Sequence, residues 1–128
     1  MSYYFSKTIH KTYEESQSYV EEKLKNYEFG IVTELDMHKK FKEKLGIDFR
    51  RYKILGACSP KHAYKAISEE EHIGLMLPCN VIIQDKGENT VEVSVIDPIA
   101  SMQAVNNPSL REIANEIQTS LKAFIESL

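Results

Sequence analysis

A predicted β-hairpin constrains the fold of this chain more than any other feature. The apolar stretch 73–84 leads into the sequence DKGENT, in which the Asp, Gly and Asn residues favour a tight turn. After this turn, Val91, Val93 and Val95 alternate with polar residues, as in a strand with one buried face. Strands joined by so short a turn pair antiparallel, so the sequence predicts an antiparallel sheet.

The remaining elements predict helices layered on this sheet. Strands are expected at 3–9, 29–35 and 52–58, separated by helices at 13–27, 37–45 and 60–67, and a last helix follows the hairpin at 110–125. The order lacks the strict alternation of strand and helix that characterises a parallel doubly wound fold. The fold class is therefore α+β, a two-layer sandwich with helices packed on one face of a mainly antiparallel sheet.

Capping residues support the first and last helices. Thr12 with Glu15, and Ser109 with Glu112, match the spacing of a capping box at the start of a helix. The last helix also carries apolar residues at helical spacing, which predicts that one of its faces is buried in the core.

Composition and charge exclude several classes of protein. The 128 residues suit a single domain spanning 1–128, and 42% hydrophobic with 27% charged residues is ordinary for a globular chain. A net charge of −3 gives no electrostatic footprint for binding nucleic acid. No apolar run reaches the roughly 20 residues of a membrane-spanning helix, and the N-terminus lacks a signal-peptide pattern. We therefore expect a cytoplasmic protein that binds neither nucleic acid nor membrane.

The two cysteines draw attention to one part of the sequence. Cys58 ends a predicted strand directly before a helix, and Cys79 follows Pro78 inside the predicted strand 73–84. Proline cannot donate to a sheet ladder, so an edge, bulge or break is expected at that position. Gly56 leaves room for another group to approach closely. With only two cysteines, free thiols in a reducing compartment are expected.

The same part of the chain resembles a known family. The stretch LGIDFRRYKILGACSPKHAYKAISEEEHIGLMLPCNVII at 45–83, with VIDP at 95–98, is similar to the domain of unknown function 302 family, DUF302. The resemblance runs from about Phe29 to Met102, with the flanking elements in the expected places. It implies a small two-layer α+β domain that forms homodimers. The family has no established activity to transfer.

A candidate ligand site follows from these blocks. Its residues are Cys58, His62, Pro78, Cys79, Asn80 and Asp97. His62 follows Cys58 by four residues and could add a ligand or a base, although a lone helical histidine is more often a surface residue. Asp97, before a proline, is either a helix cap or a carboxylate serving a site. The sequence does not identify a cofactor, and its histidines form no local pattern of metal ligands.

Three readings of the cysteines remain open. Both thiols could be small buried hydrophobic residues, the site of a dimeric binding or interaction module, or a redox or soft-metal pair. No nucleotide-binding, nucleophile-elbow or zinc-protease motif is present in the sequence. A dimeric, non-enzymatic module with a pocket near Cys58 and Cys79 for a small molecule is favoured, and thiol-dependent redox or soft-metal handling is the alternative.

Overall fold

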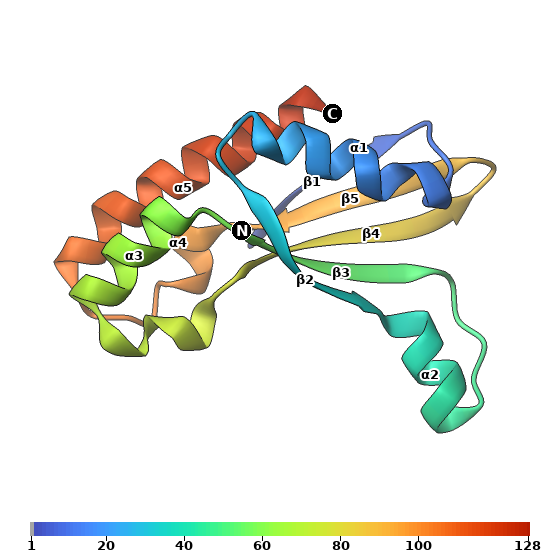
Figure 1. Ribbon diagram of the computed structural model, residues 1–128, viewed down its shortest axis with the longest axis horizontal. Coiled ribbons are helices and arrows are strands. Elements are labelled where there is room, and N and C mark those ends of the chain that lie inside the picture. The colour runs from blue at the N-terminus through green and yellow to red at the C-terminus, as the bar shows by residue number, and fades with distance from the viewer. Residues whose placement is uncertain (1) are drawn as a thin grey trace.

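The computed structural model describes residues 2–128 as one five-stranded antiparallel sheet with helices (Figure 1). The sheet order is β1-β5-β4-β3-β2, and all neighbouring strands are antiparallel. The strands are β1 (Tyr4–Ile9), β2 (Gly30–Asp36), β3 (Tyr52–Cys58), β4 (Cys79–Gly87) and β5 (Thr90–Ile96). The helices are α1 (Tyr13–Lys25), α2 (Met37–Leu45), α3 (Pro60–Glu69), the 3₁₀ helix η1 (Glu71–Met76), α4 (Pro98–Ser101) and α5 (Pro108–Ser127). The predicted α+β class is confirmed.

Helices α1 and α5 cover one face of the sheet (Figure 1). The alternating valines of β5 point to this face and are fully buried, together with Leu121 and Phe124 of α5. The opposite face, which carries Tyr4, Tyr52 and Ile82, is crossed by no helix of the described chain (Figure 1). No helix within residues 2–128 has both the length and the apolar character needed to cross a membrane.

The predicted caps are correct for α1 and wrong for α5. Thr12 and Glu15 form a reciprocal capping box, in which the Thr12 hydroxyl accepts a bond from the Glu15 amide. Helix α5 is capped instead by Asn107, whose side chain accepts a bond from the Ser109 amide 3.0 Å away. The reason is Pro108, which has no amide hydrogen and suits the first position of a helix, so that the residue before it becomes the cap.

The predicted strand 73–84 begins later than expected. Residues 71–76 form the 3₁₀ helix η1, Leu75 is 87% exposed, and β4 starts at Cys79. An apolar run by itself does not distinguish a strand from a helical turn. Pro78, joined to Leu77 by a cis peptide, therefore lies directly before the ladder and does not interrupt it.

Candidate functional site

Both cysteines line one cavity at one end of the sheet. Strands β3 and β4 pair so that Ala57 lies opposite Cys79, which places Cys58 beside Cys79 on the neighbouring strand. Helix α3 starts two residues after Cys58 and carries His62 over the same end. A cavity of about 30 Å³ lies there, lined by Phe29, Ala57, Cys58, Ser59, His62, Ala63, Ala66, Leu77, Pro78, Cys79 and Ile117. The structure thus brings four of the six candidate residues together: Cys58, His62, Pro78 and Cys79.

The size of this cavity limits what it can hold. A single water needs roughly 10–15 Å³ of such space, and organic ligands occupy pockets of roughly 300–1,000 Å³. About 30 Å³ therefore accommodates one or two waters or a single ion. An organic molecule does not fit unless the surrounding chain moves.

The electrostatics of the cavity keep Cys79 protonated. Burial, and to a smaller extent the neighbouring Cys58, raise the pKa of the Cys79 thiol to about 11. The thiolate is the nucleophilic form of cysteine, so Cys79 is unreactive near neutral pH. Cys58 is only partly buried, and both cysteines are free thiols.

His62 is buried, although its sequence context favours a surface position. Its Nδ1 lies 2.9 Å from the Ser59 hydroxyl, and its Nε2 lies 3.2 Å from a carboxylate oxygen of Glu116 on α5. A ring protonated at Nε2 satisfies both contacts, donating to Glu116 and accepting from Ser59. Both ring nitrogens are thus engaged. In residues 2–128, no group of three or more His, Cys, Asp or Glu side chains is placed to hold a metal ion.

Gly56 accounts for the position of Pro78. A Cβ atom on Gly56 would lie 2.5 Å from Cγ of Pro78 and 2.1 Å from Oγ1 of Thr33. The proline ring can pack against the sheet only because position 56 lacks a side chain. This contact fixes the path of the chain into β4, and with it the position of Cys79. The close neighbour expected at Gly56 is therefore the Pro78 ring.

Asn80 and Asp97 lie away from the cysteine cavity. Asn80 is exposed and pairs with Gly56 on the face of the sheet opposite α1 and α5. Asp97 caps α4 by accepting a bond from the Ile99 amide at 3.0 Å, and it also accepts bonds from the Gln118 side chain at 3.1 and 3.2 Å. Both carboxylate oxygens of Asp97 are therefore occupied.

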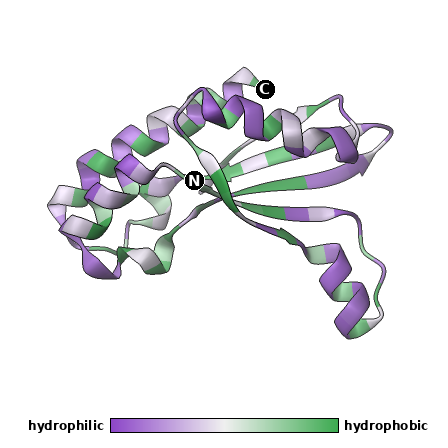
Figure 2. Ribbon diagram, in the orientation of Figure 1, coloured by the Kyte–Doolittle hydropathy of each residue, from purple (hydrophilic) through white to green (hydrophobic). Residues whose placement is uncertain are grey.

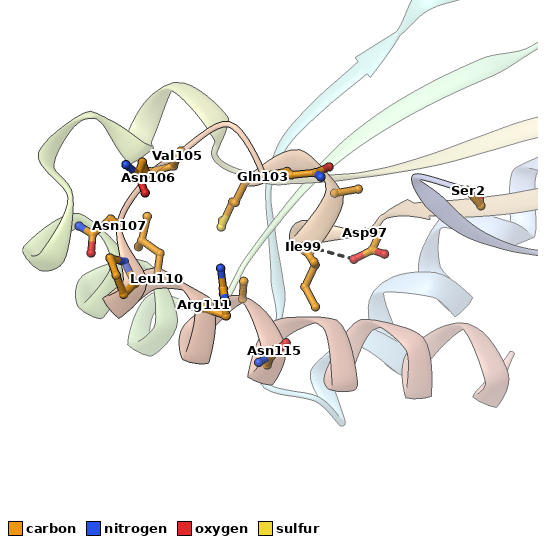
Figure 3. Close-up of a pocket in the computed structure, with 14 residues that line it drawn as sticks. Ser2, Asp97, Ile99, Gln103, Val105, Asn106, Asn107, Leu110, Arg111 and Asn115 are labelled. Atoms are coloured by element: carbon orange, nitrogen blue, oxygen red, sulfur yellow. Dashed lines mark hydrogen bonds between the residues drawn. The ribbon is translucent and has the colours of Figure 1, made fainter.

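A larger groove lies beside Asp97, between α4, the loop 102–107 and the start of α5 (Figure 3). Its volume is about 420 Å³. Apolar residues, among them Ile99, Met102 and Leu110, share its lining with Gln103, Asn106, Arg111 and Asn115. Sequence reasoning missed this groove because it forms where an irregular loop folds back on a helix. The Asn-Asn-Pro turn and the lone arginine that follows it were the only signals.

Some polar side chains of this groove are hydrogen-bonded within the chain and others are not. Asn107 is engaged, since its amide donates to the Glu69 carbonyl at 3.0 Å and its oxygen accepts the Ser109 amide. The side chains of Gln103, Asn106, Arg111 and Asn115 make no hydrogen bond or ion pair with any other described residue of the chain. One guanidinium and three amides are therefore free to meet a ligand.

Comparison with known proteins finds a family and a solved structure to which this chain is similar. The model of the family described as "Domain of unknown function DUF302" matches residues 5–128. A solved structure described as an uncharacterized conserved DUF302 protein from Bacillus stearothermophilus is similar over 98% of both chains, with 27% sequence identity and a TM-score of 0.89. No curated protein matches the sequence.

Proposed function

Because this chain belongs to the DUF302 family, whose description assigns no activity, we propose a function from the geometry alone: a homodimeric, non-catalytic module that binds a small molecule. The observation that carries the proposal is the groove beside α4 and α5. Its volume of about 420 Å³ falls within the range of small-molecule sites, roughly 300–1,000 Å³. Its lining combines apolar side chains with a few unpaired polar groups, which is the composition such sites have.

The unpaired arginine indicates the class of ligand. Among the described residues that line the groove, Arg111 is the only cation, and Asp97, the only acidic one, already uses both oxygens for bonds within the chain. A guanidinium matches a carboxylate in charge and geometry, and the free amides can donate further bonds to it. Ile99, Met102 and Leu110 offer an apolar wall. We assign the groove a small carboxylate that carries an apolar body.

Matched ligands test this assignment. Thermal unfolding is followed with benzoate and hexanoate, and with benzamide and hexanamide as uncharged controls of nearly the same shape. A ligand that binds only the folded state raises the unfolding temperature. We expect the carboxylates to raise it and the amides to leave it unchanged.

Variants then locate the binding. Arg111→Gln should abolish the carboxylate effect, whereas Lys122→Gln, on the same helix but outside the groove, should retain it. Equal effects of carboxylates and amides, or equal responses of the two variants, would refute the carboxylate site.

The homodimer is the second part of the proposal. The uncovered face of the sheet favours it. Light scattering at micromolar concentration should give twice the 14.7 kDa of one chain. A mass near 14.7 kDa would refute the dimer. The carboxylate site in the groove would still be tested separately by the thermal unfolding experiments.

A second candidate function concerns the cysteine cavity, the pocket that sequence reasoning favours. Its support is that two thiols line a space of about 30 Å³, which suits one soft metal ion. Thiol titration with and without reductant, combined with metal analysis of the purified protein, tests it. Bound metal, or thiols that react only after reduction, would favour metal or redox handling. Metal-free thiols that react only on unfolding would favour two buried structural residues.

A further inference from the structure

Helix α2 and the segment after it expose apolar side chains that a stable domain normally buries. We call residues 37–49 the arm. No residue of α2 is buried, and Leu45, Ile47 and Phe49 are 65%, 50% and 42% exposed. Figure 1 shows α2 projecting from the body formed by the sheet, α1 and α5, and Figure 2 shows hydrophobic residues interspersed along it. Sequence spacing alone predicts an apolar stripe of Met37, Phe41 and Leu45. The described part of the chain covers Met37 and Phe41 only in part and leaves Leu45 exposed.

The arm is nevertheless well organised. The backbone amide of Tyr52 donates to Nδ1 of His38 at 3.0 Å, which ties the start of α2 to β3. The rings of Phe41 and Phe49 meet edge to face at 5.3 Å. Gly46, at φ +66°, ends the helix by donating to the Lys42 carbonyl. Because an isolated helix of nine residues is marginal in water, such an arm indicates a surface prepared for a partner.

A surface of matching character lies on the same chain. We call it the outer face, meaning the side of the sheet opposite α1 and α5. It contains a hollow of about 330 Å³, whose lining includes Tyr3, Tyr4, Tyr52, Asn80, Ile82 and Glu92. Tyr3 and Tyr4 are 64% and 44% exposed. Aromatic side chains such as these tyrosines are enriched at the centres of protein interfaces.

Charge also favours contact between copies. The arm carries four lysines, at positions 39, 40, 42 and 44, against Glu43 and Asp48, a net charge of +2. The whole chain has a net charge of −3, so the rest of it carries −5. On the outer face itself Arg50 balances Glu92, since Gln84 accepts from Arg50 and donates to Glu92, so the attraction is between the arm and the body as a whole. The arm of one copy is therefore attracted to the body of another.

We propose that the arm of one copy packs across the outer face of a second copy, and that the second copy does the same in return. The inference rests on the homodimer proposed above and names its interface. In a two-fold symmetric dimer the arm and the outer face of each chain are both covered, because each chain provides one of each. A standard interface buries about 800 Å² on each partner, roughly a tenth of the 7772 Å² that this chain exposes.

Complementation between two variants tests the interface. The arm variant combines Leu45→Ser with Ile47→Ser, and the face variant is Ile82→Glu. Leu75→Ser serves as the control, because Leu75 is 87% exposed on η1 and belongs to neither surface. Sedimentation velocity of the full chain gives the mass, and circular dichroism checks that each variant is folded.

We expect the wild type and Leu75→Ser to be dimers, and the arm and face variants to be monomers when each is alone. Mixed together, those two variants should form a heterodimer, because one intact arm then meets one intact outer face. If the wild type and the arm variant are both dimers, the homodimer is supported but this interface is wrong. A monomeric wild type would overturn both. If the face variant does not fold, the arm variant alone tests the interface. The two side chains that it changes are exposed in the single chain, so their replacement should not unfold it.

Discussion

Replacing Gly56 with alanine should disturb the contact that directs the chain into the cysteine cavity. The added Cβ would lie 2.5 Å from Cγ of Pro78 and 2.1 Å from Oγ1 of Thr33, and real Cβ contacts are longer than 3.0 Å. Thr33 can respond by rotating its side chain, but the ring of Pro78 can yield only by a small change of pucker unless its backbone also moves. The clash is therefore relieved mainly by displacing the chain at the entrance to β4.

The expected cost follows from overpacking a close contact, about 1–3 kcal/mol of the free energy of unfolding. Gly30→Ala is the matched control in the same sheet, because a Cβ atom added at Gly30 would meet no described atom within 4 Å. The control should change stability by less than about 0.5 kcal/mol, as exposed substitutions usually do.

Urea denaturation of both variants measures these free energies. Adding Thr33→Ala to Gly56→Ala should restore only part of the lost stability, because the proline ring remains in place. Gly56→Ala and Pro78→Ala combined should cost less than the sum of their separate costs, because the added Cβ atom then meets no proline ring. Equal stability of the Gly56→Ala and Gly30→Ala variants would refute the close packing of Pro78 on Gly56.

Three further predictions address the core, the thiols and one ion pair. Leu121→Ala should cost about 2–5 kcal/mol because it opens a cavity under a fully buried side chain, whereas the exposed Lys42→Ala should cost under about 0.5, as denaturation midpoints would measure. Iodoacetamide at pH 8 should alkylate Cys58 well before Cys79, whose burial raises its pKa to about 11, and mass spectrometry would follow both. The Gly87 amide and the Arg51 side chain lower the pKa of Asp85, so this carboxylate stabilises the fold above its unfolded pKa of about 3.9 and loses that effect as pH falls further. The stability advantage of the wild type over Asp85→Asn should therefore shrink below about pH 4.

The sequence predicts the helices and strands better than it predicts the tertiary contacts of individual residues. Strand alternation, the hairpin turn and the capping box at Thr12 depend on neighbouring residues, and these predictions are confirmed. The run before Pro78 is apolar but forms η1, because its preference for a helical turn depends on contacts with α3 that no local pattern reveals. His62 has the sequence context of a surface residue and is buried because α3 packs against α5, where Glu116 contacts its ring.

For the candidate site as well, the sequence predicts some residues correctly and misplaces others. Cys58, His62, Pro78 and Cys79 lie within blocks that the sequence marks as unusual, and strand pairing brings them to one cavity. The sequence groups Asp97 and Asn80 with them, yet these two residues lie in the groove and on the outer face. The groove is large enough for an organic ligand and the cysteine cavity is not. The volume of a cavity depends on long-range packing, which the spacing of residues along the chain does not reveal.

Mapping a bound carboxylate on the folded protein tests the proposed function most directly. Backbone amide resonances of the ¹⁵N-labelled wild type are followed by NMR while benzoate is added, with benzamide as the control. We expect shifts that saturate and that centre on Gln103, Arg111 and Asn115 around the groove, with none from benzamide. Shifts centred on Cys58 and Cys79, or no saturable shifts with any carboxylate, would contradict the carboxylate site.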